Sequence, residues 1–137
     1  MRIVFGTDEE TPLTTAVLAR LREKGHEVAQ VATGEAWPEV GRAVGAAVAD
    51  GSAECGVVCC WTGTGVSIAA NKVPGVRAAL CTDAATAEGA RRWNDANVLA
   101  LGLRLTSPVV AGEMIDAFLG AGPDDDELET IARVEGH

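Results

Sequence analysis

The sequence has no long hydrophobic run, few basic residues and no paired cysteine motif, and each absence excludes a class of function. No stretch approaches the roughly 20 apolar residues of a membrane-spanning helix. Only 11 lysines and arginines are scattered among 20 aspartates and glutamates, and the net charge of −9 argues against nucleic acids and anionic membranes as partners. Without a Cys-x-x-Cys pair or a nearby set of histidines, we expect no metal site.

Motifs for nucleotide binding and for secretion are absent as well. No G-x-G-x-x-G follows the first predicted strand, and no glycine loop carries the lysine of a phosphate loop. The segment from Met1 to Gly6 is typical of a first strand rather than of a secretion signal. In the soluble, cytoplasmic protein that this indicates, we expect free thiols at all four cysteines, namely Cys55, Cys59, Cys60 and Cys81.

The distribution of apolar residues predicts a single domain over residues 1–137. At 137 residues and 47% hydrophobic content, the chain can bury one core. Strand-like runs alternate with helical segments, which is the pattern of a parallel sheet covered on both faces. We expect a three-layer α/β/α fold around a five-stranded, Rossmann-like (flavodoxin-like) sheet with strands at Arg2 to Gly6, His26 to Val31, Gly56 to Cys60, Val76 to Leu80 and Asn97 to Leu101.

Two hydroxyl residues that precede prolines mark helix starts. Thr11-Pro12 and Ser107-Pro108 each combine a capping side chain with a proline, whose backbone suits the first helical position. The helix after Ser107 carries one apolar stripe that we expect in the core, formed by Val110, Met114, Ile115 and Phe118. The acidic segment from Gly122 to His137 is expected at the surface or facing a partner.

The segment from Cys59 to Lys72 is the strongest functional signal. An apolar strand ends at Cys60, Gly63 and Gly65 allow a tight turn, and a helix is expected from Val66 to Asn71 with its unpaired N–H groups facing the turn. A helix start of this kind binds anions and favours the thiolate form of a cysteine. It suits abstraction of a carbon-bound proton and stabilisation of an enediolate. The alternative is a buried structural cysteine beside a tight loop.

A ligand crevice is expected beyond the carboxyl ends of the strands. Cys59 and Cys60 must point to opposite faces of the sheet, and the position of Cys60 at the strand end favours it as the residue that faces the crevice. If the first and third strands are neighbours, the loop that carries Asp8, Glu9 and Glu10 flanks the same crevice. For Glu10, a solvated position near a helix start is the simpler interpretation.

The residues from Thr62 to Asp83 and from Ala90 to Arg104 resemble the type B ribose-5-phosphate isomerases and the related galactose-6-phosphate isomerase subunits. This resemblance implies interconversion of aldoses and ketoses through a cis-enediolate, with no metal or other cofactor. Cys60 stands where one group of the family has a cysteine base, and Val66 stands where another group has a glutamate base.

The same resemblance implies roles for neighbouring residues. Thr62 would assist at the sugar ring oxygen, and Asp8 would bind sugar hydroxyls. The enediolate would be held by the backbone around Trp61, Gly63, Thr64 and Gly65. Asn94 and Arg104 match positions that the family takes from a second subunit, so the expected assembly is a homodimer with shared active sites, or a tetramer.

The sequence departs from the family pattern at the phosphate and ring-opening positions. Glu9 replaces a phosphate-binding histidine, Trp93 replaces the ring-opening histidine, and an acidic tail with Arg133 replaces an arginine-rich one. Carboxylates repel a phosphate dianion, and an indole has only an N–H donor. We therefore expect the ligand to be a sugar or sugar derivative whose phosphate is altered or absent.

The tryptophans leave two interpretations open. Trp61 and Trp93 either line one pocket, where flat apolar rings stack on a sugar, or pack at the dimer interface. Trp37 either caps the same crevice or is a surface anchor. For the whole chain, the leading hypothesis is an aldose–ketose isomerase with Cys60 as its base. The alternative is a non-catalytic or partner subunit that binds a sugar-like ligand.

Overall fold

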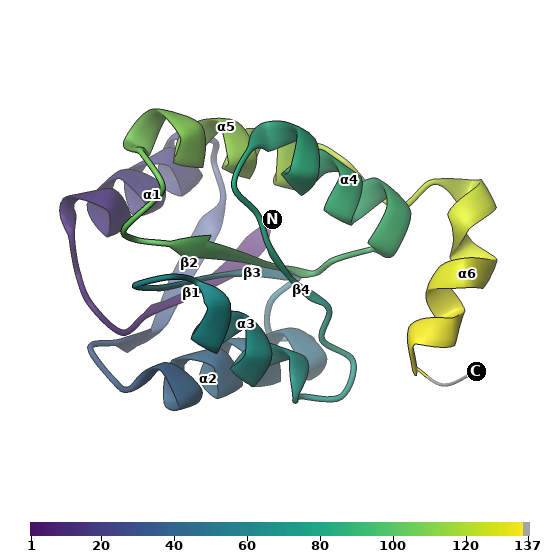
Figure 1. Cartoon of the computed structure of the whole chain (residues 1–137), viewed down its shortest axis with the longest axis horizontal. Coiled ribbons are helices and arrows are strands. Elements are labelled where there is room, and N and C mark those ends of the chain that lie inside the picture. The colour runs from purple at the N-terminus through teal and green to yellow at the C-terminus, as the bar shows by residue number, and fades with distance from the viewer. Residues whose placement is uncertain (136–137) are drawn as a thin grey trace.

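The computed structural model describes residues 1–135 and contains one parallel sheet between two layers of helices (Figure 1). The strands lie in the order β2-β1-β3-β5-β4. Their bounds are Arg2–Thr7 for β1, Glu27–Thr33 for β2, Cys55–Cys60 for β3, Ala78–Leu80 for β4 and Val98–Gly102 for β5. The predicted three-layer α/β/α class is confirmed. The last two residues of the predicted tail, Gly136 and His137, lie outside the described residues.

The helices separate the core into two halves. Helices α1 (Pro12–Glu23), α4 (Ala84–Asn94) and α5 (Pro108–Leu119) cover one face of the sheet, and α2 (Trp37–Ala49) and α3 (Thr64–Asn71) cover the other (Figure 1). After α5, a 3-10 turn (Asp125–Glu127), the short helix α6 (Leu128–Ala132) and a second 3-10 turn (Arg133–Glu135) form an arm beside the main body. No helix within residues 1–135 is both long and apolar enough to cross a membrane.

The strand order differs at one end from the flavodoxin order, in which β4 follows β3. Here β3 pairs with β5, and the three-residue β4 lies at the edge of the sheet. At the other end, β1 lies between β2 and β3, as predicted. The loops that follow β1 and β3 are therefore neighbours at the carboxyl edge of the sheet, where ligands of such folds bind.

The helix starts that the sequence marked are confirmed. The Thr11 side chain accepts a hydrogen bond from the Thr14 backbone, and the Ser107 side chain accepts one from Val110, each with a proline in the first turn. Asp83 caps α4 in the same way. Three of the four residues of the predicted stripe on α5 are fully buried, namely Met114, Ile115 and Phe118. Because these helices satisfy their own first N–H groups, they serve the core rather than a ligand.

Candidate active site at the carboxyl edge of the sheet

The two adjacent cysteines at the end of β3 face opposite halves of the core. Cys59 packs on the side of α1, α4 and α5, whereas Cys60 packs on the side of α2 and α3. Burial raises the pKa of Cys59, and burial together with the Asp83 charge raises the pKa of Cys81 to about 11, so both remain thiols at neutral pH. Of the two adjacent cysteines Cys59 and Cys60, Cys60 is the one that lines a pocket in the described part of the chain.

The turn after Cys60 places the start of α3 beside the thiol. Gly63 has a φ of 78°, a left-handed conformation that glycine adopts without strain, and α3 then begins at Thr64. This start is two residues earlier than the sequence predicted. No side chain caps the helix. The first backbone N–H groups of α3 are thus left for a ligand, and the positive end of the helix dipole favours an anion there.

The loop after β5 holds this turn in place. The backbone N–H of Leu103 donates to the Cys60 carbonyl at 2.9 Å, and the N–H of Arg104 donates to the Trp61 carbonyl at 3.0 Å. A Cβ atom on Gly63 would lie 2.9 Å from the Gly102 nitrogen, so the two loops are in direct backbone contact. The position of the α3 start relative to Cys60 is therefore fixed by the sheet and not by the loop alone.

These elements enclose a pocket of about 390 Å³, which we call the active-site pocket. It is lined by Asp8, Trp37, Cys60, Trp61, Thr62, Thr64, Gly65 and Ile68. The predicted crevice between the loops after β1 and β3 is thus present, and it gathers most of the predicted site residues. Gly63 is buried beneath the turn and shapes it. Sequence reasoning missed Ile68, although its position one helical turn after Thr64 could have indicated it.

Asp8 lines the pocket, and one of its carboxyl oxygens is buried without a partner in the described part of the chain. Its Oδ1 atom is buried and makes no hydrogen bond within the described residues, while its backbone N–H donates to the Cys59 carbonyl at 3.3 Å. Burial, with a smaller contribution from Glu9, raises the pKa of the Asp8 carboxyl. On the same wall, the hydroxyls of Thr62 and Thr64 lie 2.8 Å apart. A carboxylate, two hydroxyls and a thiol therefore meet around one small space, an arrangement that fits a polyhydroxylated ligand.

A family model described as Ribose/Galactose Isomerase matches residues 3–135. The chain belongs to the ribose/galactose isomerase family. It is 37% identical to a ribose-5-phosphate isomerase B of Escherichia coli K12 over 98% of this chain and 96% of that protein. It is 39% identical to a D-erythrulose-4-phosphate isomerase of Pectobacterium atrosepticum over 88% of this chain and 84% of that protein.

A solved structure gives the same result. The ribose-5-phosphate isomerase B of Clostridium thermocellum superposes with a TM-score of 0.92 at 35% identity, covering 98% of this chain and 95% of the other. The predicted membership in this family of sugar-phosphate isomerases is confirmed. The family match over residues 3–135 extends well beyond the two segments that carry the sequence resemblance.

Besides Gly63, four predicted binding residues of this family member are not in the lining of the active-site pocket of a single chain: Glu9, Trp93, Asn94 and Arg104. Glu9 and Arg104 are exposed. Trp93 lies on its own helix, where a Cβ on Gly89 would come within 2.5 Å of its ring, so Trp61 and Trp93 do not share a pocket within one chain. Helix α4 runs back from the carboxyl edge, and its last residues therefore lie at the opposite edge of the sheet.

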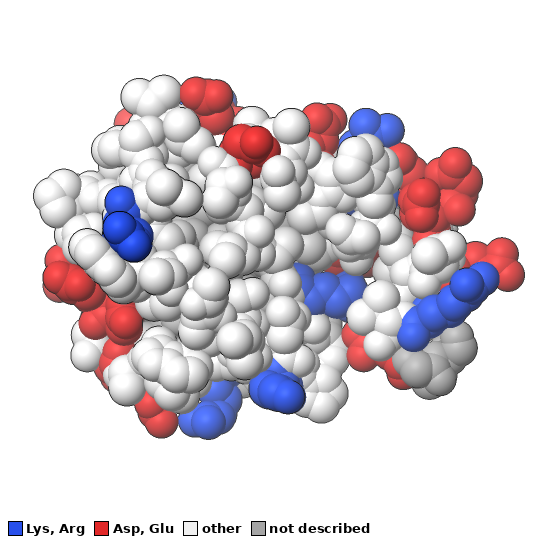
Figure 2. All heavy atoms as spheres, in the orientation of Figure 1, with Lys and Arg blue, Asp and Glu red and all other residues white. Residues whose placement is uncertain are grey.

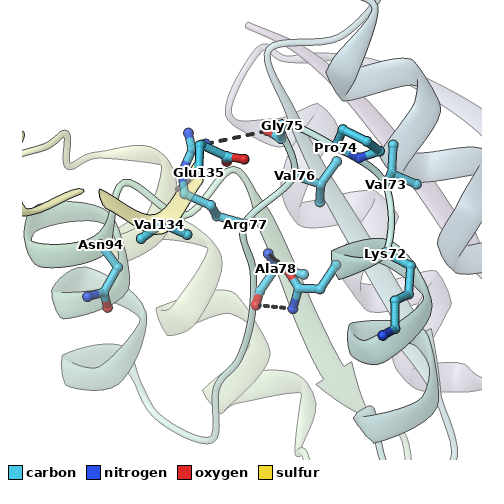
Figure 3. A pocket seen from close by; sticks show the side chains of 11 residues that line it. Lys72, Val73, Pro74, Gly75, Val76, Arg77, Ala78, Asn94, Val134 and Glu135 are labelled. Carbon is cyan, nitrogen blue, oxygen red and sulfur yellow. Dashed lines mark hydrogen bonds and ion pairs between the residues drawn. The ribbon is translucent and has the colours of Figure 1, made fainter. Parts of the chain in front are cut away.

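A larger pocket of about 730 Å³ lies at that opposite edge and involves the C-terminal arm. We call it the amino-edge pocket; it is lined by residues 71–78, Asn94, Val134 and Glu135 (Figure 3). Arg77 donates to the carbonyl and carboxylate of Asp95 at 2.7 and 3.2 Å, and it pairs with Glu135 at 3.4 Å. Figure 2 shows acidic side chains gathered over the arm, as expected for an exposed acidic segment.

Proposed function

We propose that this protein is an aldose–ketose isomerase that works through a cis-enediolate, with Cys60 as the base. The observation that supports this most directly is the position of Cys60 beside the uncapped start of α3, with Asp8 in the same pocket. The Cys60 thiolate removes the proton from the carbon next to the carbonyl. A proton, which can exchange with solvent while it is on Cys60, is delivered to the neighbouring carbon, and a hydroxyl proton moves between the two substrate oxygens, so the reaction needs no external oxidant or reductant.

The remaining groups of the pocket stabilise the intermediate in this proposal. The backbone N–H groups from Thr64 to Val66 donate to the enediolate oxygens, where negative charge develops. Asp8, which lines the pocket, accepts a hydrogen bond from a substrate hydroxyl. The hydroxyls of Thr62 and Thr64 lie 2.8 Å apart, so one donates to the other, and the hydroxyl that receives this bond donates to a further substrate oxygen.

In place of the ligand with an altered or absent phosphate that Glu9 and the acidic tail predict, we propose a four-carbon, open-chain sugar phosphate as the preferred substrate. One relative is named a D-erythrulose-4-phosphate isomerase. In a four-carbon sugar with a phosphate on its last carbon, no free hydroxyl can close a five-membered ring on the carbonyl. Such a substrate needs no ring-opening acid, which fits Trp93 at the position where the family resemblance has a histidine. Within the described residues, the active-site pocket has no histidine, lysine or arginine in its lining.

The absence of a cation in that lining supports a homodimer with shared sites. Asn94 and Arg104 lie outside the pocket of their own chain, and we propose that they complete the pocket of the partner. An apolar hollow of about 520 Å³ between β4 and α4 includes the exposed Leu80 and Trp93 and fits a subunit contact. The four free, buried cysteines support a reducing compartment, and we propose the cytoplasm. Sedimentation of the purified protein measures the assembly.

Deuterium exchange tests the proposed reaction. The protein is incubated in deuterated water with D-erythrulose 4-phosphate, D-ribose 5-phosphate and both unphosphorylated sugars, and NMR follows deuterium at the carbon next to the carbonyl. We expect exchange to be fastest with D-erythrulose 4-phosphate. Faster exchange with D-ribose 5-phosphate would overturn the four-carbon substrate but not the isomerase. No exchange with any sugar would reject catalysis and favour the non-catalytic subunit.

A further inference from the structure

Trp37 contributes an apolar wall to the active-site pocket from outside the glycine turn. It opens α2, and its ring lies on the backbone of Gly65 in the first turn of α3. A Cβ atom on Gly65 would lie 2.8 Å from Cδ2 and 2.9 Å from Cε3 of the indole. Since real Cβ contacts are essentially never this short, no side chain fits at position 65 while the indole keeps its place. Trp37 is 44% exposed, and it lines the pocket.

The close packing of α2 against α3 fixes the position of the backbone that carries Trp37. A Cβ atom on Gly41 would lie 2.5 Å from the Ala69 Cβ, and one on Gly45 would lie 3.3 Å from the Ala70 carbonyl oxygen. The two helices are thus in close contact along the stretch that follows Trp37, and Pro38 stiffens the first turn of α2. A ring that is already held in place loses little conformational entropy when a ligand binds.

The pocket consequently has two chemically different walls. Asp8, Thr62 and Thr64 supply oxygen atoms, whereas Trp37, Trp61 and Ile68 supply apolar surface. An extended sugar chain likewise has hydroxyl groups on some sides and C–H bonds on others, and C–H bonds pack well on an aromatic face. The two walls therefore match one orientation of the chain, with the hydroxyls toward Asp8 and the C–H bonds toward the indoles.

We propose that Trp37 determines substrate specificity by stacking against the C–H face of an open-chain sugar; this inference rests on the proposed isomerase function. The stacking orients the carbon chain so that its hydroxyls reach Asp8 and its reactive carbon reaches Cys60. A sugar with a hydroxyl of the opposite configuration places a polar group against the indole. Trp37 thereby selects among stereoisomers and among chain lengths.

Kinetics of three variants test this role. We expect Trp37→Ala to raise KM for D-erythrulose 4-phosphate about tenfold with kcat within about twofold, because the ring contacts the non-reacting part of the chain. Trp37→Phe keeps a flat ring and should restore KM to within about threefold of the wild type. Gly65→Ala should raise KM as Trp37→Ala does, because its methyl group displaces the indole. The matched control is Gly122→Ala, where the added Cβ has nothing within 4 Å.

A binding measurement separates this inference from the isomerase itself. The chain has 3 tryptophans, so Trp61→Phe combined with Trp93→Phe leaves Trp37 as the single indole fluorophore. We expect its fluorescence to change saturably with D-erythrulose 4-phosphate, and this result would support the stacking even if deuterium exchange were absent. Exchange without a fluorescence change, or a Trp37→Phe variant with the same KM as Trp37→Ala, would overturn the stacking role.

Discussion

The two pockets at opposite edges of the sheet differ in how their polar groups are satisfied. In the amino-edge pocket, the Arg77 guanidinium pairs with Glu135, which lies beside it in Figure 3, and it also donates to the backbone carbonyl of Asp95. The Asn71 side chain donates to the Ala78 carbonyl and accepts from the Ala78 N–H. In the active-site pocket, a buried oxygen of Asp8 has no partner within the described residues, and no side chain caps α3. In the larger pocket Arg77, Glu135 and Asn71 are thus paired, whereas the smaller pocket retains a carboxyl oxygen that is unpaired in the part of the chain that the structure describes.

This difference indicates that pocket volume alone does not mark a site. A buried polar group without a hydrogen bond costs about 1–3 kcal/mol, and the described residues retain two, Asp8 Oδ1 and His26 Nδ1, of which Asp8 belongs to the active-site pocket. Paired groups such as Arg77 and Asp95 instead join segments that are distant in the sequence. The ion pair between Arg77 and Glu135 in the amino-edge pocket therefore holds the C-terminal arm against the main body. The active-site pocket instead retains an uncapped helix start that a ligand can bind.

The largest effect should come from Cys60→Ser. A hydroxyl is far less acidic than a thiol, and a general base typically contributes 10²–10⁴-fold, so we expect kcat/KM to fall by at least about 10²-fold with little change in KM. The matched control is Cys55→Ala on the same strand, at the amino edge, whose activity should stay within about twofold of the wild type. Equal losses in both variants would show that the site does not depend on the strand-end thiol.

Asp8→Asn should separate activity from stability. Because burial and Glu9 raise the folded-state pKa of Asp8, ionisation of this carboxyl disfavours the folded state. The stabilisation from its neutral form is complete below the unfolded-state pKa and is lost as the pH rises through the folded-state pKa. Asp8→Asn cannot ionise, so its free energy of unfolding should exceed that of the wild type near pH 7, by about 1 kcal/mol or less, and not near pH 4.

The activity of Asp8→Asn should change in the opposite direction from its stability. We expect kcat/KM to fall by roughly 10- to 100-fold, because an amide replaces the carboxylate that accepts a hydrogen bond from the substrate. Thermal unfolding at both pH values, together with the exchange assay, measures the two effects. A variant that is both less stable and less active near pH 7 would contradict the account of Asp8 as an unsatisfied ligand-binding group.

The smallest effect should come from Glu135→Gln in the amino-edge pocket. This change removes the ion pair with Arg77. The side chain of Arg77 is 22% exposed and that of Glu135 is 41% exposed. Partly exposed pairs contribute little, so we expect the free energy of unfolding to change by less than about 0.5 kcal/mol and kcat/KM to stay unchanged. Denaturant unfolding and the exchange assay test both. A substantial loss of activity would give the amino-edge pocket a direct part in the reaction.

Several features of the fold could be predicted because they depend on neighbouring residues. The strand runs, the caps at Thr11 and Ser107, and the opposite orientations of Cys59 and Cys60 follow from local patterns and from the two-residue period of a strand. The start of α3 was predicted two residues late, because the glycine turn is shorter than its composition suggests.

Other features depend on contacts between distant segments and could not be predicted. β4 and β5 have swapped places relative to the flavodoxin order, because β3 pairs with β5 and not with β4. The sequence left the roles of the tryptophans open, and the structure shows which of them line the active-site pocket of a single chain. Trp37, not Trp93, joins Trp61 in the active-site pocket, because α2 packs on α3 through glycines whereas the end of α4 lies at the far edge of the sheet.

By itself, the sequence determined the α/β class, the family and the strand-end position of Cys60, since each follows from the order of residues along a short segment. Only the tertiary structure decided that Asp8, Cys60 and Trp37 meet in one pocket, and that Asp8 is left without a partner there. The physical reason is that burial and hydrogen-bond satisfaction are properties of the packed chain. They are set by segments that lie far apart in the sequence and come together at the carboxyl edge of the sheet.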